Sequence, residues 1–144
     1  MTALAAVYDR LPHAGGMRLL DQVLAWDAES IRCNTDSHRS LANPLRRDGG
    51  LAAAHAVEYA AQAAAVHGVL SGALDGAPVL LLAAVRGMEL DLDRLDGLPG
   101  PLEVSARLVA RAGANAIYRF TLGSGAEDCA RGAITLMPGP EGQA

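Results

Sequence analysis

Residues 49–74 are apolar over most of their length and carry one formal charge, on Glu58. Much of this segment is alanine, the best helix former, and Gly49, Gly50 and Gly68 mark its two ends. The sequence therefore predicts a helix between these glycines. A helix that is apolar nearly all round is a buried helix, so the rest of the chain is expected to fold around it.

Glu58 is the candidate for chemistry in this segment. A carboxylate is costly to bury, so one that stands alone on a buried helix is expected to serve a purpose. Burial favours the neutral form, which suits a carboxylic acid to donate a proton near neutral pH. The alternative is that Glu58 lies on an exposed stripe of the helix or satisfies a buried backbone group.

Composition narrows the class of protein. The chain of 144 residues is expected to form a single domain over residues 1–144. Nucleic-acid binding needs basic stripes and aromatic stacking platforms. This chain has a formal charge of −4, no lysine and only 3% aromatic residues, so we do not expect it to bind nucleic acid.

The cysteines and the apolar segments bear on localisation. Cys33 and Cys129 are far apart and lack metal-ligand spacing, so we interpret them as reduced core residues of a cytoplasmic protein. Residues 1–10 lack the basic region and the long apolar run of a signal peptide. The helix segment is not expected to span a membrane, because it is largely alanine and four polar residues interrupt it. These are His55, Glu58, Gln62 and His67.

Hydrophobic alternation and turn residues predict the other elements. Residues 30–35 have strand periodicity, and a hairpin around residues 27–29 is expected to join them to the apolar run from Met17 to Trp26. A short turn of helix is expected at Ala5–Arg10, and residues 36–50 form a polar loop before the central helix. Four further strands are predicted at Val79–Leu90, Leu102–Ala110, Ala116–Leu122 and Cys129–Met137. This order is α+β, and a sheet around one apolar helix usually needs a second copy to cover what stays exposed.

Four short motifs point to a known family. They are LPH at residues 11–13, LLDQV at 19–23, NP at 43–44 and VEYAAQ at 57–62. In order and spacing these resemble the hotdog-fold 3-hydroxyacyl-[acyl carrier protein] dehydratases. The loop sequence NPLRRDG is similar to the divergent branch of that family found with aryl polyene and other pigment gene clusters. The resemblance implies a dimeric hotdog fold, with a long central helix wrapped by an antiparallel sheet.

The resemblance also implies a reaction, the loss of water from a 3-hydroxyacyl thioester in fatty-acid-like or aryl polyene biosynthesis. Dehydration needs a base for the C2 proton, an acid for the departing hydroxyl and a dipole at the thioester carbonyl. Glu58 matches the family's acid, and backbone N–H groups of Gly49 and Gly50 are candidates for the dipole. No cofactor of the chain's own is implied, because the acyl group travels on the phosphopantetheine of an acyl carrier protein.

The base is where this sequence departs from the family. The usual dehydratases have a histidine fourteen residues before the helix carboxylate, and that count from Glu58 falls on Pro44, next to Asn43. Asn43 is a candidate for substrate contact there. His38, six residues before Pro44, is the best available base if the loop folds differently. The alternative for His38 is a loop histidine that bonds to neighbouring backbone or is exposed.

His55 and Gln62 flank Glu58 along the helix and are further candidates for substrate contact. His55, three residues before Glu58, could tune the carboxylate, act as the base or form a core polar contact. The Gln62 amide is expected to anchor a neighbouring loop or a partner subunit. His13 and His67 are expected to be structural.

The basic residues of the loop suggest a partner. Arg39, Arg46 and Arg47 would suit an acidic carrier protein and its phosphopantetheine phosphate. The alternative is that these arginines form a solvated face, as charge runs in loops usually do.

Three functions fit these observations. The first is a dehydratase, with Glu58 of one chain facing the Ser37–Pro44 loop of the other chain in a homodimer. The second is a catalytically degenerate hotdog subunit that pairs with an active dehydratase, as the missing histidine would allow. The third is a hotdog acyl thioesterase, in which the carboxylate activates water. A fold alone cannot separate these three.

Overall fold

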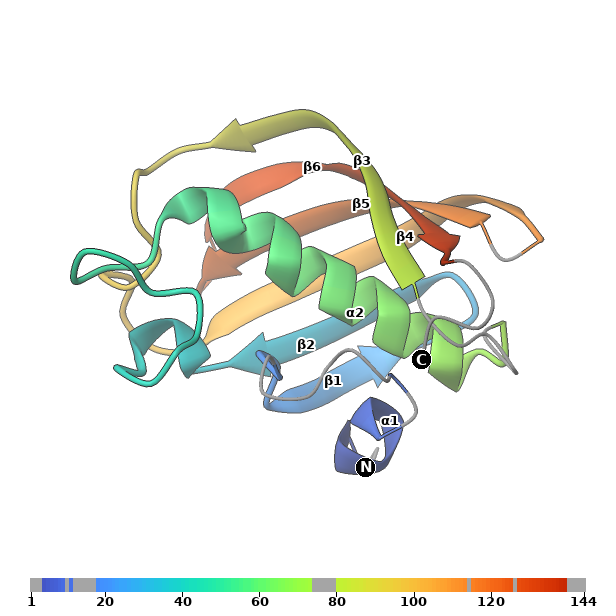
Figure 1. Ribbon diagram of the computed structural model, residues 1–144, viewed down its shortest axis with the longest axis horizontal. Coiled ribbons are helices and arrows are strands. Elements are labelled where there is room, and N and C mark those ends of the chain that lie inside the picture. The colour runs from blue at the N-terminus through green and yellow to red at the C-terminus, as the bar shows by residue number, and fades with distance from the viewer. Residues whose placement is uncertain are drawn as a thin grey trace.

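The computed structural model describes residues 4–9, 11, 18–73, 80–113, 115–125 and 127–139. Within these residues six strands form one antiparallel sheet in the order β1-β2-β4-β5-β6-β3, and the sheet curves around a central helix, α2 (Figure 1). A short helix, α1 (Leu4–Tyr8), contacts α2. The strands are β1 (Gln22–Trp26), β2 (Ser30–Thr35), β3 (Leu80–Leu90), β4 (Leu102–Ala112), β5 (Asn115–Ser124) and β6 (Glu127–Pro138).

The strand predictions are confirmed, with β4, β5 and β6 longer than predicted. The bounds of β2 are those predicted, and its side chains alternate between buried and more exposed positions. The hairpin between β1 and β2 turns at Asp27, whose Oδ1 accepts from the N–H groups of Glu29 and Ser30, both at 2.8 Å. Cys33 on β2 and Cys129 on β6 are both free thiols. Two residues of the LPH motif, Pro12 and His13, lie outside the described residues.

The central helix begins and ends later than the sequence predicts. A 3-10 turn, η2 (Ala53–His55), leads into α2 (Ala56–Leu70), and Gly68 lies buried inside the helix rather than at its end. The helix ends at Leu70, and Gly72 lies just beyond it, with its N–H donating to Val69 O (3.2 Å). The φ of Gly72 is 82°, a left-handed conformation that glycine adopts at little cost.

The core lies between α2 and the concave face of the sheet. Along α2 the buried positions are mainly alanine and valine, so the helix axis can approach the strands closely. The helix packs chiefly against β4 and β2 and has few contacts with β3. The largest fully buried apolar side chains are Tyr59, Tyr118, Phe120, Leu19, Ile31, Leu51, Leu95, Leu102, Leu122 and Ile134. No helix among the described residues is long and apolar enough to cross a membrane.

Strand β3 forms one edge of the sheet. It is eleven residues long, and among the residues that the structure describes it pairs only with β6. Four of its apolar side chains are exposed by 37–45% of their surface, namely Leu81, Leu82, Val85 and Leu90. A long apolar edge strand presents unpaired backbone groups and readily pairs with a strand from another chain.

Candidate functional site

Glu58 lies in the first turn of α2, where the helix dipole favours a negative charge. Its side chain is half-buried, and so are Val57 and Ala61 on the same flank of the helix. The sequence pattern led us to expect a fully buried carboxylate, but this flank is not covered by the protomer's own sheet. Among the residues that the structure describes, the Glu58 carboxylate has no hydrogen-bond or ion-pair partner. It is therefore free to meet a substrate or a second chain.

Tyr59, the residue after Glu58, joins α2 to the preceding loop. Asn43 Nδ2 donates to the Tyr59 hydroxyl (3.1 Å) and to Ser37 O (2.8 Å). Ser37 Oγ donates to Leu19 O (2.7 Å), so the hydroxyl of Tyr59 donates to Ser37 Oγ (2.9 Å). Asn43 Oδ1 accepts from Leu45 N–H (2.8 Å), which occupies the rest of the amide. The Asn43 side chain thus fixes the loop against the first turn of α2.

Gln62 ties the same helix to the amino-terminal segment. Its Oε1 accepts from the Tyr8 hydroxyl (2.6 Å) and from Leu19 N–H (3.0 Å). The Tyr8 hydroxyl in turn accepts from Leu20 N–H (3.0 Å). The expectation that this amide anchors a neighbouring segment is met by these bonds.

Asn43→Ala is expected to lower the free energy of unfolding by about 2 kcal/mol, because it removes the hydrogen bonds to Ser37 O and the Tyr59 hydroxyl and leaves Leu45 N–H without its partner. Urea denaturation of the variant and the wild type measures this difference. Asn34→Ala is the matched control, since Asn34 is half-buried on β2. A loss equal to that of the control would contradict the anchoring role of Asn43.

His38 is fully buried in a 3-10 turn (Ser37–Arg39) of the loop. A carbonyl oxygen only accepts hydrogen bonds, so His38 Nε2–H donates to Leu98 O (3.0 Å) and Nδ1 holds the lone pair. Nδ1 is buried and has no hydrogen-bond partner. Burial holds the pKa of His38 below its usual value, so the ring is neutral at pH 7. The ring has the protonation state of a base, but within the protomer it is closed to solvent.

The other candidates near Glu58 do not place a base at the family's histidine position, fourteen residues before Glu58. Pro44 occupies the position of the family histidine and is exposed. His55 is partly buried at the junction of η2 and α2 and makes no side-chain hydrogen bond that would cap the helix.

Gly49 and Gly50 lie before η2, in a tight turn rather than in the helix. Arg47 and Gly50 exchange both backbone hydrogen bonds (2.9 and 3.0 Å) around Asp48 and Gly49, which have φ of 53° and 80°. Two consecutive positive φ values are typical of a type I′ turn. The N–H of Gly50 is therefore occupied by Arg47 O and is not free for a thioester carbonyl.

An ion pair from the β3–β4 connection holds this turn in place. Arg94 Nη2 bonds Asp96 Oδ2 (2.6 Å) and also donates to Gly49 O (3.1 Å). Asp96 Oδ1 accepts from Leu51 N–H (2.8 Å). The hydrogen bond from the Arg94 guanidinium, and after it the one from Leu51 N–H, hold the pKa of Asp96 well below its usual range. A Cβ at Gly50 would stand within 2.6 Å of the guanidinium, so glycine permits this close approach.

The three loop arginines bond to their own loop. Arg39 pairs with Asp36 (2.8 Å), Arg46 donates to Gly49 O (3.0 Å) and Arg47 donates to Pro44 O (3.1 Å). Arg39 and Arg47 are exposed and Arg46 is partly exposed, so all three remain within reach of a docked partner. Across the described residues no three His, Cys, Asp or Glu side chains converge to hold a metal ion.

His67 is fully buried near the end of α2 and has both ring nitrogens bonded. Nε2–H donates to Asp27 O (2.8 Å), and Nδ1 accepts from the Tyr118 hydroxyl (2.7 Å). The Tyr118 ring packs edge-on against the imidazole, and Arg111 donates to the Tyr118 hydroxyl (3.3 Å). His67 therefore connects α2 to the β1–β2 hairpin and to β5.

Stability is expected to fall as the pH drops below about 6.5, the usual pKa of histidine. Burial holds the pKa values of His38 and His67 below that value, so the unfolded chain binds more protons than the folded one as the pH falls. Urea denaturation at pH 7.5 and pH 5.5 measures the change. His67→Gln should make stability less dependent on pH over this range. An unchanged dependence would show that His67 ionises equally in both states.

Tyr59 and Asp96 are structural partners of the site that sequence reasoning did not single out. A hydroxyl within an apolar helix usually finds a buried partner, and that signal could have identified Tyr59. Asp96 lies far from the loop in sequence, and no local pattern connects it to Leu51. Together these residues hold the loop before α2 against the rest of the protomer, next to the helix turn that carries Glu58.

The family model of the ApeP-like proteins, described as ApeP dehydratase, matches residues 5–144. The dehydratase heterocomplex ApeI:P from Xenorhabdus doucetiae gives a TM-score of 0.78 at 19% identity and covers 94% of this chain and 91% of that chain. The PaaI protein of the phenylacetic acid degradation operon of E. coli gives 0.62 at 10% identity, with 95% and 91% covered. A mutant thioesterase from Pseudomonas aeruginosa gives 0.57 at 13% identity, with 96% of both chains covered. These likenesses confirm the hotdog fold; a search of curated proteins found no match.

Proposed function

This chain belongs to the ApeP-like dehydratase family, and we propose that it supplies the carboxylic acid of a two-subunit 3-hydroxyacyl thioester dehydratase. In this proposal a second hotdog chain supplies the histidine base. The acyl group is carried on the phosphopantetheine of an acyl carrier protein, in aryl polyene or fatty-acid-like biosynthesis. This combines the first two functions that the sequence suggests.

One contrast within the structure carries the proposal. Glu58 is half-buried and has no partner among the described residues, whereas His38 is sealed in the protomer and bonded to Leu98 O. A catalytic acid must contact the substrate, and a base must reach the C2 proton through space or one water. In this chain Glu58 can therefore contact a substrate as the acid, whereas His38 cannot reach one as the base.

The edge strand supports a second chain as the source of that base. Pairing of β3 with a strand from a partner would cover its exposed leucines and valine and satisfy its unpaired backbone groups. The similar ApeI:P structure is described as a dehydratase heterocomplex. In this proposal the partner also covers the flank of α2 that carries Glu58, which the protomer leaves half-buried. We therefore propose that the pair forms edge to edge, with Glu58 at the subunit interface.

The proposed reaction divides the proton transfers between the chains. The partner's histidine removes the C2 proton, and the electrons of that C–H bond form the C2–C3 double bond as the C3–O bond breaks. Glu58 gives its proton to the departing hydroxyl, which leaves as water. The proton on the histidine then returns to the Glu58 carboxylate, directly or through solvent. The loop arginines would receive the acidic surface of the carrier protein.

The test is a comparison of this chain alone, a hotdog dehydratase partner alone, and the two together, each with a 3-hydroxyacyl carrier protein. Mass spectrometry is expected to detect loss of water with the mixture and little with this chain alone. Full activity of this chain alone would favour a homodimer with an internal base. Release of free acid from a thioester without a 3-hydroxyl would indicate a thioesterase instead.

A further inference from the structure

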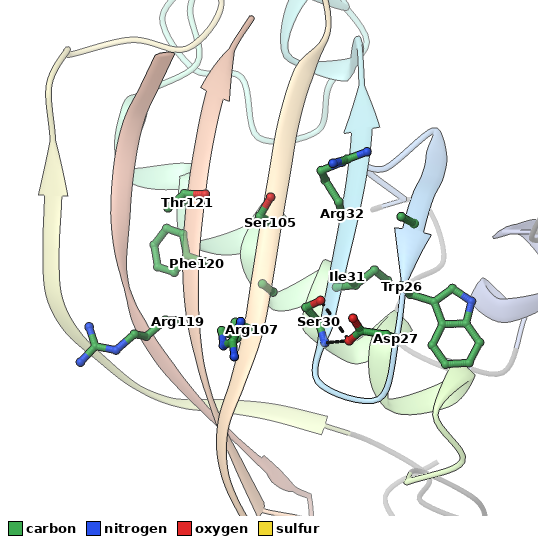
Figure 2. A pocket seen from close by; sticks show the side chains of 12 residues that line it. Trp26, Asp27, Ser30, Ile31, Arg32, Ser105, Arg107, Arg119, Phe120 and Thr121 are labelled. Carbon is green, nitrogen blue, oxygen red and sulfur yellow. Dashed lines mark hydrogen bonds between the residues drawn. The ribbon is translucent and has the colours of Figure 1, made fainter. Parts of the chain in front are cut away.

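The face of the sheet opposite α2 carries a second feature of interest, a hollow of about 440 Å³. It lies over β1, β2, β4 and β5, and Figure 2 shows the side chains that line it. The polar residues lining it are Asp27, Ser30, Arg32, Ser105, Arg107, Arg119 and Thr121. This face is remote from Glu58, which is on the helix that covers the other side of the sheet.

Strand register places these side chains in two neighbouring rows. Arg107 on β4 is directly opposite Arg119 on β5. In the next row Ser105 is opposite Thr121 and, on its other side, Arg32 of β2. Neighbouring strands are about 4.8 Å apart, so the two hydroxyls form a polar floor, and the three arginines lie on the same face of the sheet beside it. Figure 2 shows the arginine side chains spreading away from this floor.

Three arginines and one carboxylate, Asp27, line the hollow, so its lining carries a net positive charge. Arg107 reaches Glu29 at 3.4 Å and Arg32 reaches Glu103 at 3.1 Å, but these pairs are solvent-exposed and weak. Arg119 is exposed and has no ion pair among the described residues. Like charges directly opposite on a sheet are destabilising, so the Arg107–Arg119 pair carries an electrostatic cost. A bound anion would offset that cost.

We propose that this hollow binds the phosphate group of a small molecule. Guanidinium groups and hydroxyls are the side chains that hold phosphate oxygens best, because arginine donates in a planar fork and the hydroxyls add further donors. The volume falls within the range of small-molecule sites. An acidic protein helix would reach the arginines at the rim but not the hydroxyl floor, so a compact phosphate fits the hollow better. The proposal does not depend on dehydration at Glu58.

The probe is inorganic pyrophosphate, titrated calorimetrically into the wild type and into Arg107→Gln, Arg119→Gln and Arg18→Gln. Each of the first two variants is expected to weaken binding about tenfold, which corresponds to about 1.4 kcal/mol, since a charge-assisted hydrogen bond to the anion is lost. Arg18→Gln removes the same charge far from the hollow, where Arg18 pairs with Asp9 (2.7 Å), and should change binding little. Equal weakening by all three variants, or no binding by the wild type, would overturn the proposal.

Two further ligands distinguish the source of the phosphate. Coenzyme A tests an organic phosphate, and a carrier protein lacking its prosthetic group tests an acidic protein surface. Binding of coenzyme A with the same loss in Arg119→Gln would support an organic ligand, and pyrophosphate binding alone would indicate free phosphate. If only the carrier protein binds at these arginines, the phosphate assignment is wrong. Dehydration by the assembled pair should be unchanged in Arg119→Gln, so this test and that of the proposed function can fail separately.

Discussion

Replacing Glu58 with glutamine is expected to lower the dehydration rate of the assembled pair about 10²- to 10⁴-fold, the usual contribution of a positioned general acid. Glutamine has nearly the same shape but has no acidic proton to give to the departing hydroxyl. Because Glu58 has no hydrogen bond or ion pair with any described residue, folding should be unaffected. Mass spectrometry of the acyl carrier protein under single-turnover conditions measures the rate.

Glu58→Asp is the matched control for that substitution. Aspartate keeps a carboxylic acid and changes only its position by shortening the side chain. Glu58→Asp should therefore retain more activity than Glu58→Gln. Equal rates for the wild type and Glu58→Gln, with the pair intact, would remove Glu58 from the reaction.

The second large effect is expected at the edge of the sheet. The double variant Leu82→Lys and Val85→Lys should weaken association with the hotdog partner about 100-fold or more, because it places charges on an apolar edge strand. These side chains are 37% and 40% exposed in the protomer, so the protomer itself should still fold. Analytical ultracentrifugation of the two chains across a range of concentrations measures the association.

A control variant for the association measurement changes two exposed apolar residues that lie away from the β3 edge. Val109 and Ile117 are 53% and 40% exposed on β4 and β5, away from the β3 edge. Changing both to lysine adds the same charge and removes similar apolar surface. If this control weakens association as much as the β3 variant, the partner does not dock along β3.

Local patterns were sufficient to predict the architecture. Alternation identified β2 with its bounds, and the alanine-rich segment identified α2, because burial in this fold follows the strand and helix periods closely. The helix ends were wrong for a specific reason. Gly68 lies buried inside the helix and does not have a positive φ, whereas Gly72 does. A sequence lists both glycines without distinguishing those roles.

The site was harder to predict because its contacts are long-range. The sequence identified Glu58, Asn43 and Gln62 as candidates, and the structure shows the latter two holding the loop and the amino-terminal segment against α2. His38 bonds to Leu98 O, sixty residues away, and this contact cannot be predicted from the loop sequence itself. The arginine pair on the outer face likewise required the register of β4 against β5.

The most direct test of the account places the acid and the base in different chains. Water loss from a 3-hydroxyacyl carrier protein should be measured with three assembled pairs, carrying Glu58→Gln, His38→Gln, or a glutamine in place of the partner's loop histidine. Glutamine at His38 can still donate to Leu98 O, so the protomer should fold. We predict that the pair with His38→Gln remains active and that the other two pairs lose water-loss activity. An inactive but folded and assembled His38→Gln pair, beside an active Glu58→Gln pair, would contradict it.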